Sequence, residues 1–161
     1  MVVVATVAVA ACLAVCDADC MFQPDPNGAV VIPPAVTSIV DNAFSGCPGL
    51  ASLTIPDAVA SIGYAAFSGC TGLASIAIPD AVTSIPSRIV FGCTSLVSIT
   101  IPEAVTSIGS EAFVACTSLV SIIIPEAVTS IGYGAFSECT GLVSITIPDA
   151  VASLTGPAFL A

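Results

Sequence analysis

The chain has 161 residues, an apolar fraction of 57% and a net charge of −10 from eleven acids and one base. Its length is that of one domain. The near-absence of Lys and Arg excludes nucleic acid and anionic membrane surfaces as partners, because both are held by clustered basic groups. With one Arg, no His and no Lys, the chain also lacks the usual general bases and oxyanion-stabilising cations, which argues against an enzyme.

The segment from Met1 to Cys16 is almost entirely apolar, and Asp17-Ala18-Asp19-Cys20 follows it. Small residues at Cys16 and Ala18 suit cleavage after Ala18, so residues 1–18 are predicted to be a secretory signal peptide. The start of the run has no basic residue, and an apolar strand or helix that covers the first repeat is the alternative. Cleavage predicts a secreted or cell-surface protein, whereas an intact segment predicts a cytoplasmic one. From Asp17 onward no apolar run reaches the ~18–20 residues of a membrane-spanning helix.

From residue 28 to the end, an Ile-Pro pair returns with a constant period of 23, as the difference between positions 32 and 55 shows. The pairs are Ile32-Pro33, Ile55-Pro56, Ile78-Pro79, Ile101-Pro102, Ile124-Pro125 and Ile147-Pro148, without insertion or deletion. A fixed period of this length predicts a solenoid, in which each repeat is one coil that buries its apolar face by stacking on its neighbours. Function is then expected in surface rows that run along the stack.

One repeat, from Leu73 to Cys93, predicts how a coil is built. Leu73-Ala-Ser-Ile76-Ala-Ile78 has the L-x-x-L-x-L spacing of a leucine-rich repeat strand, and Pro79 ends it because proline cannot donate to a ladder. Val82-Thr-Ser-Ile85 predicts a short extended or 3₁₀ return segment. A small residue and a phenylalanine then fill the core, although the third full copy has Ile89-Val90 there. Residues 28–161 are thus predicted to form about six stacked parallel strands in one sheet, from 29–32 to 142–147.

The string Val-Thr-Ser-Ile-Gly-x-x-Ala-Phe-x-x-Cys-Thr-x-Leu-x-Ser-Ile-x-Ile-Pro resembles the BspA-type, or Treponema-type, leucine-rich repeat. The resemblance covers roughly residue 19 to the end, and it implies a β-rich solenoid with a secreted or cell-surface role in adhesion or protein recognition. Residues 19–27 are similar to the N-terminal cap that precedes such arrays. The family has no catalytic residues to transfer to this chain, and no cofactor is expected.

Five cysteines occupy one position of the repeat, and each follows the previous one by a full period. They are Cys47, Cys70, Cys93, Cys116 and Cys139. A straight column does not converge on a metal, so buried thiols that act as small hydrophobes are expected. Cys20 lies outside the period, and secretion would permit a disulfide between Cys20 and Cys47 that links the cap to the first coil.

Two sets of polar residues form candidate binding rows. The acidic rim follows the Ile-Pro pair and consists of Asp57, Asp80, Glu103, Glu126 and Asp149. The strand face consists of outward hydroxyl residues, namely Ser52, Thr54, Ser75, Ser98, Thr100, Ser121, Ser144 and Thr146. A solvated rim and a plain outer surface are the simpler interpretations of these rows. The expected partner is a protein or surface ligand bound through one of them.

Three other interpretations stay open. The Ser/Thr rows resemble an ice-binding surface, although Ala77 and Ile123 interrupt the threonine column. The acidic rim would suit a weak cation-binding structural protein. The chain would also be a gene fragment without a function of its own if it folds only as part of a longer protein.

Arg88 and Glu111 occupy the same turn position in neighbouring repeats, which would suit a surface ion pair, although a solvated turn is the preferred interpretation. The last repeat stops at Phe159-Leu-Ala161, before another cysteine or strand, so no C-terminal cap is expected. Terminal repeats normally need a polar outer face, so two interpretations are open: either the natural protein continues beyond Ala161, or this end self-associates with another chain.

Overall fold

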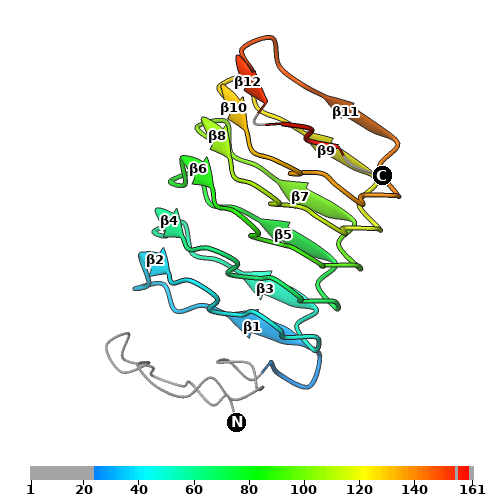
Figure 1. The fold of residues 1–161 in the computed structure, drawn as a ribbon. Helices are drawn as coiled ribbons and strands as arrows, with labels where there is room; N and C mark the ends of the chain where they lie inside the picture. Colours follow the sequence, from blue (N-terminus) through cyan, green and yellow to red (C-terminus); the bar gives the residue numbers. More distant parts are fainter. Residues whose placement is uncertain (1–23, 155, 160–161) are drawn as a thin grey trace.

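The structure is a computed structural model that describes residues 24–154 and 156–159. The chain winds into coils of 23 residues, and each coil contributes one three-residue and one two-residue strand (Figure 1). We number the coils one to six by their longer strands. These are β1 (Ala29–Val31), β3 (Ser52–Thr54), β5 (Ser75–Ala77), β7 (Ser98–Thr100), β9 (Ser121–Ile123) and β11 (Ser144–Thr146). The predicted solenoid with about six stacked strands is confirmed.

The shorter strands form a second row, which is visible on the other side of each coil in Figure 1. They are β2 (Ser38–Ile39), β4 (Ser61–Ile62), β6 (Ser84–Ile85), β8 (Ser107–Ile108), β10 (Ser130–Ile131) and β12 (Ser153–Leu154). The return segment, predicted to be either extended or 3₁₀, is therefore extended. The predicted signal peptide at residues 1–18 and most of the predicted cap, including Cys20, lie outside the described residues.

The longer strands are shorter than predicted, since each ends one residue before the Ile-Pro pair. The isoleucine still bonds to the next coil, as in the 3.2 Å contact from the Ile78 amide to the Thr100 carbonyl. The proline that follows has no N–H, so pairing cannot continue past it. Leu142 and Ile147, expected at the ends of the last strand, likewise lie outside β11.

The longer strands form the predicted parallel face, but the pairing along it is not continuous. The longer strands pair in parallel as β1 with β3, β5 with β7 and β9 with β11. β3 and β5 lie side by side without a continuous ladder between them, and so do β7 and β9. The row is therefore one surface in space, but its backbone hydrogen bonding is interrupted twice.

The shorter row breaks once, between β4 and β6. In the coils with glycine after the short strand, the glycine amide bonds to the preceding coil, as from Gly63 to the Ile39 carbonyl and from Gly109 to the Ile85 carbonyl, both at 2.8 Å. The third coil has Pro86 at this position. Because proline has no amide hydrogen, the bond to Ile62 cannot form and the ladder stops there.

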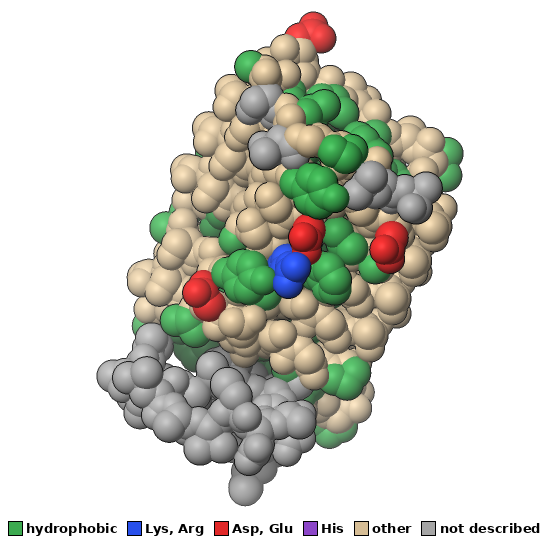
Figure 2. Space-filling model, in the orientation of Figure 1, with side chains coloured by type: hydrophobic (Ala, Val, Ile, Leu, Met, Phe, Trp, Pro, Cys, Tyr) green, Lys and Arg blue, Asp and Glu red, His purple; other side chains and the backbone are tan. Residues whose placement is uncertain are grey.

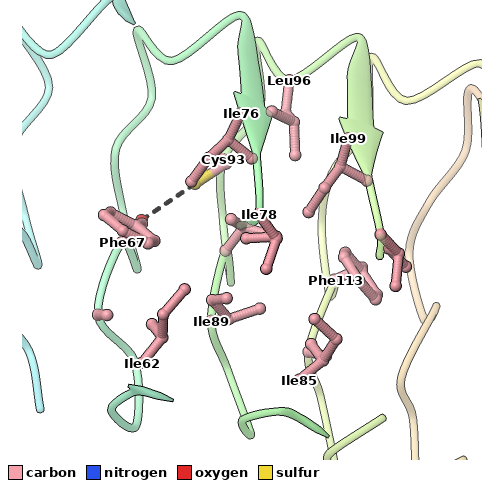
Figure 3. Close-up of a cluster of buried hydrophobic side chains, with 14 of the residues drawn as sticks. Ile62, Phe67, Ile76, Ile78, Ile85, Ile89, Cys93, Leu96, Ile99 and Phe113 are labelled. Atoms are coloured by element: carbon pink, nitrogen blue, oxygen red, sulfur yellow. Dashed lines mark hydrogen bonds between the residues drawn. The ribbon is translucent and has the colours of Figure 1, made fainter. Parts of the chain in front are cut away.

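The core lies between the two strand rows (Figure 3). Phenylalanine rings stack along it, with centroids 5.4 Å apart for Phe44 and Phe67 and 5.1 Å apart for Phe113 and Phe136. The third coil interrupts the stack, because Ile89 and Val90 take the place of a ring and are fully buried. The aliphatic pair thus fills the core as predicted.

The described part of the N-terminal segment is a turn built on Asp25. Its carboxylate accepts hydrogen bonds from the amides of Ala29 and Asn27, and these bonds hold the pKa of Asp25 below its usual value. Among residues 24–154 and 156–159 there is no helix with the length and apolar content needed to cross a membrane.

Candidate functional site

The face of the longer strands is exposed and regular. The central residue of each strand points into the core, as Ile76, Ile99 and Ile122 do, so its two neighbours point outward. All eight hydroxyl residues of the predicted strand face are exposed: Ser52, Thr54, Ser75, Ser98, Thr100, Ser121, Ser144 and Thr146. Pairing in register places each row directly along the stack.

Aliphatic side chains also line this face, and sequence reasoning missed most of them. Val97, Val120 and Val143 form a column beside the strands and are 51%, 49% and 84% exposed. Ile123 is 80% exposed on β9. The column could have been found from the sequence, because the three valines lie one repeat period apart. Exposed aliphatic groups of this kind mark contact surfaces more often than isolated hydroxyl groups do.

The acidic rim lies where the longer strands end. All five of its members, Asp57, Asp80, Glu103, Glu126 and Asp149, are exposed. Within the described residues, no group of three or more His, Cys, Asp or Glu side chains is arranged to hold a metal ion. The carboxylates therefore act as a line of separate charges along one edge of the strand face.

The cysteine column is buried. Cys70, Cys93 and Cys116 are free and fully buried, as predicted, and each thiol donates to a backbone carbonyl of the preceding coil. Figure 3 shows one such bond, 3.1 Å from the Cys93 sulfur to the Phe67 oxygen. A hydrogen bond with Cys70 and burial raise the pKa of Cys93, and burial raises the pKa of Cys116 to about 12. Cys93 and Cys116 are thus held in the unreactive protonated form.

The two ends of the cysteine column differ from its centre. Cys139 is free but only partly buried, and burial raises its pKa to about 11. Cys47 is disulfide-bonded, which corrects its interpretation as a buried thiol. Since the other described cysteines are free, the partner of Cys47 lies outside the described residues. The pairing with Cys20 remains a prediction.

A third surface, which we call the turn face, is formed by the turns that follow the shorter strands, such as residues 87–92 in the third coil. Its backbone forms a ladder between coils, for example through bonds of 3.1 Å from Arg88 to Ser110 and 2.8 Å from Gly92 to Val114. The same turn position has a left-handed backbone in five successive coils, a feature that the sequence did not reveal. Its φ angles are 56° at Asn42, 51° at Ala65, 58° at Arg88, 57° at Glu111 and 60° at Gly134.

Arg88 and Glu111 form an ion pair on the turn face, whereas a solvated turn is the preferred interpretation of the sequence. The Arg88 Nη2 atom is 2.6 Å from the Glu111 Oε2 atom, and Nε donates to the same oxygen at 2.7 Å. The guanidinium carbon also lies 5.3 Å from the centre of the Phe91 ring. The hydrogen bond and the charge of Glu111 raise the pKa of Arg88. Figure 2 shows this basic side chain beside an acidic one and among hydrophobic ones.

The C-terminal end of the stack has an apolar cavity of about 210 Å³. It is lined by Phe136, Cys139, Leu142, Val143, Ser144, Ile145 and Phe159. Leu142 and Ile145 are only partly buried, whereas their counterparts one coil earlier, Leu119 and Ile122, are buried. The cavity brings together no acid–base pair, so it offers packing rather than chemistry.

Comparison with known proteins agrees with this architecture. A model of the BspA type leucine rich repeat region matches residues 30–161 in six copies. None of the curated proteins compared with the chain matches it.

Several solved structures are similar to the chain. A leucine rich cell surface protein from Faecalibacterium prausnitzii is 41% identical, with a TM-score of 0.72 over 84% of this chain and 33% of that chain. A leucine-rich repeat protein from Bacteroides ovatus is 34% identical, with a TM-score of 0.71 over 78% of this chain and 32% of that one. The leucine rich repeat protein of T. pallidum is 30% identical, with a TM-score of 0.67 over 76% of this chain and 71% of that one. The chain thus spans about a third of the first two relatives, and it belongs to the BspA-type leucine-rich repeat family.

Proposed function

We propose that the chain is a non-enzymatic recognition or adhesion module that acts at the cell surface or outside the cell. Its binding surface is the strand face together with the acidic rim. The observation that carries the proposal is the exposed aliphatic column on this face, where Val143 and Ile123 are 84% and 80% exposed. Exposed apolar side chains that lie next to one another, rather than singly, are typical of interaction surfaces.

The charges next to the column favour a basic partner. The rim places five carboxylates along one edge of the face, and the only cation of the described residues, Arg88, lies on the turn face. An acidic partner would be repelled along the whole edge. We therefore infer a ligand with an apolar centre and a cationic border, such as a basic segment of a surface or matrix protein.

A pair of variants tests this surface. We expect Ile123→Glu to weaken binding to intact cells or matrix proteins at least tenfold, because it places a charge in the apolar centre of the interface. Thr94→Glu adds the same charge at an exposed position outside the strand face and should leave binding unchanged. Equal losses for both variants, or none for either, would remove the strand face as the binding surface.

The secretory part of the proposal has its own test. Amino-terminal sequencing of the native protein should find a chain that begins near Asp19. A native protein that retains Met1 would contradict secretion by this route. The relative from Faecalibacterium prausnitzii is described as a cell surface protein, which supports the proposal by similarity.

A further inference from the structure

The turn face has a pattern that matches itself when the order of the coils is reversed. Three of its columns run along the stack from the second to the fifth coil. The first contains Tyr64, Ser87, Ser110 and Tyr133; the second contains Ala65, Arg88, Glu111 and Gly134; the third contains Ser68, Phe91, Val114 and Ser137. Each column thus has the same kind of residue, or the opposite charge, at equal distances from the boundary between coils three and four. Ala65, Gly134, Val114 and Ser137 are buried, so the surface pattern consists of the other members of the columns.

A two-fold axis would use this pattern. If the axis lies in the interface and crosses the stack between coils three and four, it places coil three of one copy on coil four of the other. Arg88 then meets Glu111 of the second copy, and the reverse pair forms as well. Tyr64 meets Tyr133, and these side chains are 43% and 45% exposed, so both have surface to bury.

We propose that the turn face is a homodimer interface in which two copies lie antiparallel, with Arg88 and Glu111 of each copy paired to those of the other. The ion pair of each chain becomes half of a four-charge network at the centre. Tyrosine and arginine are the residues most enriched at the energetic centres of interfaces, and here they lie around the axis. The backbone ladder holds them in place before association.

The charges of the chain favour a second copy on this face and disfavour it on the acidic rim. Two rims brought together in the same way would place Asp80 against Glu103 and Asp57 against Glu126, which repel each other. On the turn face, the two outer acids meet no acid. Asp41 of the first coil falls opposite Gly156, and Glu138 of the fifth coil falls opposite Gly69.

The interface is small. From the second to the fifth coil it extends about 15 Å at a coil spacing of ~4.8 Å. Contacts of this size belong to the weak and transient class, so we expect self-association at micromolar or higher concentrations. The dimer would leave the strand face of both copies free for the ligand.

Charge exchange tests the proposal with the full chain. Sedimentation over a concentration series should show a monomer–dimer equilibrium for the wild type. Arg88→Glu places four acids at the axis and Glu111→Arg places four bases there, so each variant alone should dimerise at least tenfold more weakly. An equimolar mixture of the two variants should associate, and the double variant Arg88→Glu/Glu111→Arg should dimerise like the wild type.

Asp80→Lys is the matched control, since it changes the net charge as much as Glu111→Arg does but lies on the rim. Circular dichroism of each variant checks that the fold is intact. A wild type that stays monomeric at all concentrations, or single variants that dimerise as it does, would overturn the proposal. Association that is lost only with Val143→Lys would place the contact at the C-terminal end and would overturn it as well.

Discussion

The glycines that follow the shorter strands have a role set by space rather than by backbone conformation. Gly63, Gly109 and Gly132 do not have a positive φ, and the third coil has Pro86, whose ring fixes a negative φ, in the same position. A Cβ atom at Gly132 would overlap the backbone nitrogen of Ser110 in the preceding coil. Glycine is required there because two coils approach each other too closely for any side chain.

We therefore expect Gly132→Ala to reduce the free energy of unfolding by about 3 kcal/mol, the upper range for overpacking in a rigid core. Gly49→Ala is the control, since a Cβ atom there meets nothing within 4 Å and φ is not positive. Urea denaturation measures both. A similar loss for the two variants would show that backbone freedom, not contact, decides the choice of glycine.

The thiols should react in an order set by their burial. Among the free cysteines of residues 24–154 and 156–159, we expect Ellman's reagent to modify Cys139 first in the folded protein, because Cys70, Cys93 and Cys116 are fully buried. The thiolate is the reactive form, and the pKa of Cys139 is raised to about 11. Its reaction rate should rise about tenfold per pH unit from pH 8 to pH 10. Peptide mapping of the modified protein identifies the site, and Cys139→Ser should remove the fast phase that maps to residue 139. Modification of Cys70, Cys93 or Cys116 before Cys139 would contradict this assignment.

Some residue properties could be predicted from the sequence and others could not. The exposure of Ser98 and the burial of Ile99 follow from alternation along a strand. The left-handed backbone at Ala65 and Arg88 has no such signal, since these residues disfavour that conformation. The hydrogen bonds of the turn-face ladder impose this left-handed conformation on each coil through its neighbours. The cation–π contact between Arg88 and Phe91 was equally hidden, because it depends on how that turn is folded.

At the level of the strands, single prolines decide where pairing stops. Each longer strand ends before the Ile-Pro pair, and the shorter row breaks at Pro86. The sequence showed the prolines of the Ile-Pro pairs and Pro86, but the break in pairing at Pro86 was not predicted. Its effect depends on the glycine amides at the equivalent positions, whose hydrogen bonds become visible only in the structure.

We expect Pro86→Gly to join β4 to β6. The new amide should donate to the Ile62 carbonyl, as Gly109 does to Ile85. The gain of one hydrogen bond, about 1 kcal/mol, is offset by the greater freedom of glycine in the unfolded chain, so the free energy of unfolding should change little. Hydrogen exchange gives the decisive measurement. The amide of residue 86 should be protected in the variant, and fast exchange there would show that the coils remain apart.

For the whole molecule, the acidic rim is a source of electrostatic strain. Neighbouring carboxylates at a spacing of ~4.8 Å repel by up to about 0.9 kcal/mol per pair in water, and salt screens this repulsion. Glu103 has a rim neighbour on each side, Asp80 and Glu126. The same charges that we propose for binding a basic ligand therefore reduce the stability of the free protein.

We expect Glu103→Gln to raise Tm by about 2–4 °C at low salt, which corresponds to about 1 kcal/mol for a domain of this size. The difference should shrink as NaCl is added. Glu138→Gln removes the same charge outside the rim and should change Tm less. Thermal unfolding followed by circular dichroism measures both variants, and equal shifts would mean that net charge alone is responsible.

The boundary between the second and third coils has a mechanical consequence. Both strand rows are unpaired there, and the ring stack is interrupted as well, since Ile89 and Val90 follow Phe67. Among the described residues, the ladder of the turn face crosses this boundary, together with the bond from the Ala74 amide to the Ala51 carbonyl and the bond from the Cys93 thiol to the Phe67 carbonyl. In a solenoid, cooperativity passes from each coil to the next, so one weak junction divides the stack into two blocks. A molecule pulled from its two ends should therefore yield first at this junction, and an adhesion protein built this way would extend in steps under load.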